Sequence, residues 1–117
     1  MKFEVLFYQN QNGDSPVEEF LNSVDTKMQA KIVGMLELLQ EKGTSLRETY
    51  SKNLGDGIFE LRCKQGSNIT RILYFFYYKG KIIVTNGFVK KSDKTPKNEI
   101  VLAKKRRDNF LESEGKK

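Results

Sequence analysis

Arginine and lysine are the residues in this sequence whose types and spacing suit chemistry on a negatively charged substrate. Arg62 and Arg71 lie in two neighbouring apolar stretches, and a third stretch is followed by Lys90, Lys91 and Lys94. A planar guanidinium can grip two phosphate oxygens, and nearby cations stabilise the charge that develops when a phosphate group reacts. These side chains therefore point to work on a phosphodiester.

Several familiar catalytic and metal sites are excluded by composition. The chain contains no histidine, which rules out Ser/His and Cys/His catalysis and a histidine-ligated metal. Its one cysteine, Cys63, has no partner for an internal disulfide or a paired-cysteine zinc site. A glycine-rich phosphate loop of the Gly-x-x-x-x-Gly-Lys type is also missing. We therefore expect no metal and no cofactor.

Each basic residue also has a purely structural interpretation, which is the more common one when that residue is taken alone. Arg62 would pair with Glu60 or another carboxylate on an exposed sheet face, Arg71 would border a solvated strand end, and the three lysines would form a solubilising loop. The functional interpretation requires the strands to pair so that Arg62, Arg71 and the lysines line one concave surface.

The positive charge is concentrated in the second half of the chain. The net charge of the 117 residues is +6; residues 1–57 carry six basic and nine acidic side chains, and residues 58–117 carry fifteen and six. A basic half attracts polyanions, most often nucleic acid, although solvated lysines alone would give the same count. The length suits a single domain, residues 1–117. We expect a cytoplasmic protein, because no secretory start and no bilayer-spanning apolar run is present.

Hydrophobic periodicity predicts an ordered succession of elements. A strand over 3–8 is followed by two helices, one starting at the Ser15 N-cap and one running from 25 or 26 to 42. After a connector over 44–57, three strands lie within 57–89, too close together for crossover helices and hence antiparallel. A last helix opens with Thr95 as N-cap and Pro96 at its first position.

Side chains alternate between the two faces of a strand. Phe59 and Leu61 should therefore face the helical core, and Glu60 and Arg62 should project from the opposite face. Arg71 opens the next strand, which is apolar on both faces and should be central in the sheet.

Three blocks of this region together resemble the HigB branch of the RelE/ParE toxin superfamily. They are Gly-x-x-Glu-Leu-Arg at 57–62, Arg-Ile-Leu-Tyr-Phe at 71–75, and Gly-Phe-Val-Lys-Lys-Ser-x-Lys-Thr-Pro at 87–96. The order of elements agrees as well, so the resemblance covers nearly the whole chain. It implies a RelE-like α+β fold, with a small antiparallel sheet packed against two N-terminal helices and a C-terminal helix.

The resemblance also implies a function and partners. It indicates the toxin of a type II toxin–antitoxin pair, a metal-independent endoribonuclease that cleaves mRNA on the ribosome. The implied partner is a helix-turn-helix antitoxin of the HigA type, through which alone the toxin would reach operator DNA. The implied catalytic residues are Arg62, Arg71, Lys90 and Lys91, and the RNA-binding residues are Lys94, Tyr74, Tyr50 and Lys104. Some relatives use histidine, so the general acid and base are left open here.

The sequence leaves three alternatives open. A ParE-type member would poison DNA gyrase rather than cut RNA, a binding domain would hold nucleic acid without cleaving it, and a degenerate toxin would be inactive. In the ribonuclease interpretation, replacing Arg62 or Arg71 with alanine should abolish toxicity and spare folding.

Overall fold

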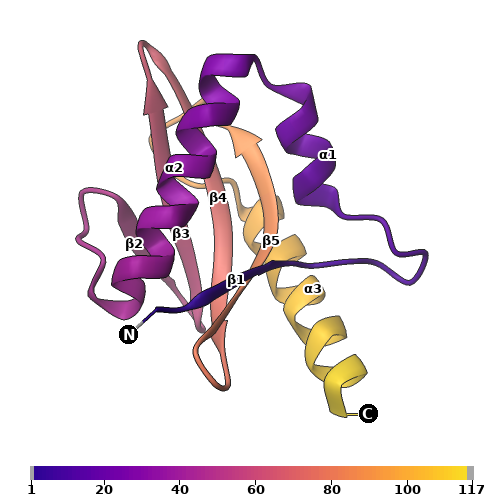
Figure 1. Cartoon of the computed structure of the whole chain (residues 1–117). Coiled ribbons are helices and arrows are strands. Elements are labelled where there is room, and N and C mark those ends of the chain that lie inside the picture. Colours follow the sequence, from indigo (N-terminus) through magenta and orange to yellow (C-terminus); the bar gives the residue numbers. More distant parts are fainter. Residues whose placement is uncertain (1, 116–117) are drawn as a thin grey trace.

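The computed structural model describes residues 2–115 as a five-stranded sheet with helices on both faces (Figure 1). The strand order is β1-β5-β4-β3-β2. The strands are β1 (Glu4–Phe7), β2 (Ser51–Gly55), β3 (Ile58–Gln65), β4 (Asn68–Tyr77) and β5 (Lys81–Val89), and the helices are α1 (Pro16–Ser23), α2 (Thr26–Lys42) and α3 (Lys97–Gly115). The predicted α+β fold is confirmed.

Local signals set the ends of the first two helices as predicted. The Ser15 hydroxyl accepts a hydrogen bond from the Glu18 amide at 3.2 Å, and the Asp25 carboxylate accepts one from the Met28 amide at 2.8 Å. Each bond satisfies one of the amides that the first turn of a helix leaves without a partner. Gly43, with a positive φ of 51°, ends α2.

The three central strands are antiparallel, as the short gaps between them required. In the register of β3 and β4, Phe59 lies opposite Tyr74 and Arg62 lies opposite Arg71. In the register of β4 and β5, Arg71 lies opposite Phe88. The ends of three strands therefore meet near Arg62, Arg71 and the lysines that follow β5.

Long-range pairing adds features that local patterns did not show. The expected connector over 44–57 contains a 3₁₀ turn, Gly43–Ser45, and the edge strand β2. Strand β1 joins the sheet parallel to β5. Helix α3 begins at Lys97, one position later than predicted, and Thr95 uses its hydroxyl elsewhere.

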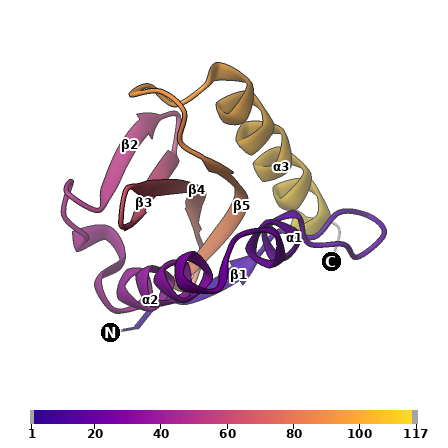
Figure 2. The same cartoon turned by 90° about the horizontal axis from the view of Figure 1, so that it is seen from above.

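The sheet separates two cores (Figure 2). Helices α1 and α2 cover one face, where Leu61, Ile72 and Tyr74 are buried, as the alternation of the strands predicted. Helix α3 covers part of the other face, over Leu73 and Phe75. Polar residues replace the apolar core on that second face at the ends of β3 and β4, next to the loop that leads into α3.

Candidate functional site

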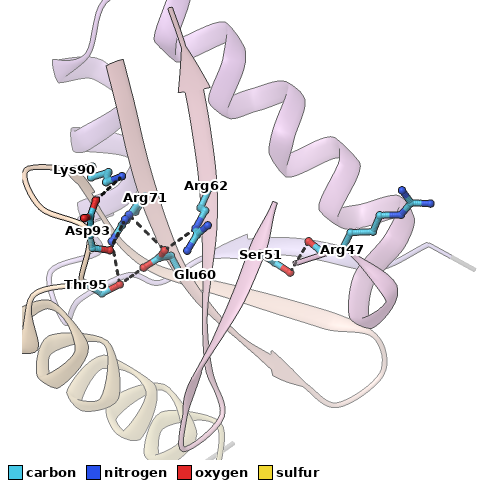
Figure 3. Close-up of polar contacts among 8 residues, drawn as sticks. All are labelled: Arg47, Ser51, Glu60, Arg62, Arg71, Lys90, Asp93 and Thr95. Carbon is cyan, nitrogen blue, oxygen red and sulfur yellow. Dashed lines mark hydrogen bonds and ion pairs between the residues drawn. The ribbon is translucent and has the colours of Figure 1, made fainter. Parts of the chain in front are cut away.

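The two arginines of the central strands are direct neighbours. Arg62 on β3 lies opposite Arg71 on β4, so both side chains leave the same face of the sheet. Like charges opposite one another destabilise a strand pair. Glu60 lies two residues before Arg62 on that face, with its Oε1 atom 3.4 Å from Arg62 Nε and 3.5 Å from Arg71 Nε (Figure 3). Its carboxylate offsets the repulsion and holds the guanidinium groups together.

Arg71 and Glu60 are tied to the loop before α3. The Thr95 hydroxyl donates a hydrogen bond to Glu60 Oε2 and accepts one from Arg71 Nη1 at 3.3 Å. Arg71 Nη2 donates to the Asp93 carbonyl at 3.0 Å. The loop over 90–96 is thus attached to β3 and β4 by one polar network, in which Glu60 and Arg71 are buried.

Burial distinguishes the two arginines. Glu60 is 0% exposed and Arg71 is 3% exposed, whereas 39% of the Arg62 side chain is exposed. Arg71 Nε, within residues 2–115, is the one buried side-chain nitrogen or oxygen without a hydrogen bond, so its contact with Glu60 is electrostatic. The other two guanidinium nitrogens bind Thr95 and Asp93. Of these two arginines, Arg62 is therefore the one whose guanidinium is accessible from solvent.

The lysines lie along the same loop. The Lys90 amide donates to the Ile69 carbonyl at 2.9 Å, and its Nζ atom lies 3.7 Å from Asp93 Oδ1. Because the Asp93 carboxylate is fully solvated, this ion pair is weak and a phosphate can compete with it. Lys91 and Lys94 are exposed on the loop.

Arg62, Arg71 and Lys90 border a hollow of about 430 Å³ beside the end of β3. This volume is typical of a small-ligand site. A larger hollow of about 580 Å³ lies between residues 9–12 and the end of α3, but its lining contains no arginine or lysine. The chemistry of the lining, rather than size, identifies the first hollow as the candidate site.

A comparison with known protein families shows which family this chain belongs to. Residues 19–108 match the family described as Phage derived protein Gp49-like (DUF891), a match that begins within α1, ends within α3 and includes every residue of the polar network. The chain belongs to this Gp49-like family. Gp49-like proteins are RelE/ParE-like toxins associated with toxin–antitoxin systems, and such a toxin has a cognate antitoxin as partner. No curated protein matches the chain.

Two of the predicted RNA-binding residues lie away from the site of this Gp49-like chain. Tyr74 is buried against Phe59 on the opposite face of the sheet, where burial raises the pKa of its hydroxyl to about 12. Lys104 lies on α3, and its Nζ atom is 3.7 Å from Asp56 Oδ2 at the turn between β2 and β3. The structure brings neither residue to the hollow, whereas Tyr50 borders it.

Two residues of the site, Glu60 and Thr95, were not predicted from the sequence. Glu60 was interpreted only as a surface partner for Arg62, although its place on the same strand face was a signal that it reaches Arg71 as well. Thr95 was assigned to helix capping, and its hydroxyl instead binds Glu60 and Arg71.

In residues 2–115, no helix is both long enough and apolar enough to cross a membrane.

The network makes a testable prediction for Thr95. Thr95→Val keeps the shape of the side chain but leaves Glu60 Oε2 and Arg71 Nη1 without their partner, which should lower the free energy of unfolding by about 1–3 kcal/mol. Urea unfolding followed by circular dichroism measures this change. Thr95→Ser, which retains the hydroxyl, is the matched control. Equal unfolding midpoints for Thr95→Val and the unaltered chain would mean that the bonds contribute nothing.

Proposed function

We propose that this Gp49-like protein is a HigB-type toxin that cleaves mRNA on the ribosome. One observation supports the proposal most strongly. Arg62 forms an ion pair with the buried Glu60, and the Arg62 and Lys90 side chains line the same open hollow. Arginine and lysine side chains that line a pocket can bind the phosphate of a phosphodiester. Membership of a toxin family makes RNA a reasonable substrate for such a pocket.

In the proposed reaction the ribose 2′-oxygen attacks the adjacent phosphorus, and the bond from phosphorus to the 5′-oxygen of the next nucleotide breaks. The 2′-hydroxyl loses a proton, the departing 5′-oxygen gains one, and a cyclic phosphate remains. Negative charge builds up on the phosphate oxygens, where Arg62 and Lys90 stabilise it. Exposed Lys91 and Lys94 hold the RNA backbone along the loop.

Arg71 has a different role in this proposal. Its nitrogens are occupied by Glu60, Thr95 and Asp93, so it positions Arg62 and the loop rather than touching the phosphate. Alignment of this kind is a large part of catalysis, because reacting groups that are held in place need not be ordered during the reaction.

The proposal extends to the partner and the place of action. A HigA-type helix-turn-helix antitoxin would hold the toxin inactive, and the toxin would reach operator DNA only through it. A toxin that cuts mRNA on the ribosome works in the cytoplasm.

The test is to induce the chain in a bacterial host and map new 5′ ends across the mRNA, with Arg62→Ala as control. Ends within translated frames that depend on translation and disappear in the control are the expected result. Growth arrest with intact mRNA would overturn the ribonuclease proposal, and DNA-damage signalling in the same cells would point to gyrase.

A further inference from the structure

The hollow beside Arg62 extends past the sheet to α2, which supplies a part of the site that the sequence did not indicate. Lys31 and Met35 of α2, with Ile69 of β4, line it together with Tyr50. Met35 is buried and Tyr50 is 41% exposed. The hollow therefore combines an apolar and aromatic surface with cations, which lie on α2, on the sheet and on the loop after β5.

A site for phosphate alone would need only the cations. Proteins that bind single-stranded nucleic acid combine a basic groove with aromatic side chains, because every base offers a flat apolar surface for stacking. We propose that this hollow is a slot for one base of single-stranded RNA, with Tyr50 contacting the base and Lys31 binding a neighbouring phosphate. This inference rests on the proposed function and specifies which part of the substrate enters the hollow.

Backbone hydrogen bonds link Tyr50, the proposed base contact, to Arg62, the proposed phosphate contact. The Arg62 amide donates a hydrogen bond to the Tyr50 carbonyl at 2.8 Å, and the Tyr50 amide donates to the Arg47 carbonyl at 2.9 Å. The Ser51 hydroxyl donates to the same Arg47 carbonyl at 3.2 Å (Figure 3). Tyr50 therefore has a defined place relative to Arg62, so that a base held at Tyr50 sets which phosphate meets Arg62.

A binding measurement tests the slot without relying on cleavage. The probe is a fluorescently labelled tetranucleotide of 2′-O-methyl RNA, which lacks the attacking hydroxyl, titrated with the purified chain. Tyr50→Ala should weaken binding about tenfold, and Tyr50→Phe, which keeps the ring, should bind nearly as tightly as the unaltered chain. Tyr78→Ala is the matched control, because Tyr78 is 78% exposed at the turn between β4 and β5 and should leave affinity unchanged.

The role of Lys31 is tested by salt dependence. Each phosphate contact on a single strand contributes about 0.7 to the slope of log affinity against log salt concentration. Lys31→Ala should lower the magnitude of that slope by about this amount. Lys27→Ala, which removes an exposed lysine one helical turn earlier, should leave the slope unchanged.

Equal affinities for Tyr50→Ala and the unaltered chain would overturn the slot, as would a loss of affinity in Tyr78→Ala as large as that in Tyr50→Ala. Failure of the proposed function gives a different result. A chain that binds the probe through Tyr50 but never cuts mRNA would overturn the ribonuclease proposal and leave the slot in place.

Discussion

If the chain is the ribonuclease that we propose, RNA cleavage by the Arg62→Ala variant should be about a hundred- to a thousand-fold slower than cleavage by the unaltered chain, because removing one donor to transition-state charge typically has an effect of this size. Arg62 is partly exposed, and its strand is held by backbone bonds that the substitution leaves intact. In this variant Arg71 still balances the charge of the Glu60 carboxylate, and the Thr95 hydroxyl still donates a hydrogen bond to it. The protein should therefore stay folded while losing activity.

The measurement is the rate at which translated mRNA is cut by purified protein in a bacterial translation extract, with circular dichroism to verify folding. Arg47→Ala is the matched control, because Arg47 is an exposed arginine that Figure 3 shows pointing away from the cluster. Folded Arg62→Ala protein that cuts at the rate of the control would remove Arg62 from the mechanism.

The Arg71→Ala variant should be defective for another reason, namely loss of stability. Removing Arg71 leaves Glu60 fully buried with only Arg62 to balance its charge, and breaking a buried ion pair in this way typically costs about 3–5 kcal/mol. Burial of Arg71 therefore predicts the opposite of the sequence-based expectation that this substitution spares folding. Loss of toxicity in Arg71→Ala would not by itself show a catalytic role.

Urea unfolding of two variants tests whether Arg71→Ala acts through loss of stability. Arg71→Ala should unfold at a clearly lower urea concentration than the unaltered chain. The double variant Glu60→Gln with Arg71→Met removes the buried charge, keeps an acceptor for Thr95 and fills the space of the arginine side chain, so it should recover most of the lost stability. An Arg71→Ala variant as stable as the unaltered chain would contradict the role assigned to the network.

Elements whose signals are local could be predicted from the sequence alone. Ser15 and Asp25 began helices because their side chains satisfy the free amides of a first turn. Alternation along β3 placed Arg62 on the face opposite Leu61, since side chains on a strand leave the two faces in turn. The same alternation, combined with the β3–β4 register, shows that Tyr74 shares the buried face of Phe59, and this could have removed it from the predicted site.

Which residues are accessible could not be predicted in this way, because accessibility depends on how distant segments pack. A strand pattern shows the face that Arg71 occupies but not what covers that face, and the covering loop comes from residues more than twenty positions later. Thr95 appeared to be a helix cap because capping is a local pattern, whereas its bond to Glu60 spans 35 positions. Lys31 joined the site only because α2 packs against the sheet next to β3. The periodicity of a sequence shows which face of a strand or helix a residue occupies. Whether that residue is buried depends on which distant segments pack against that face.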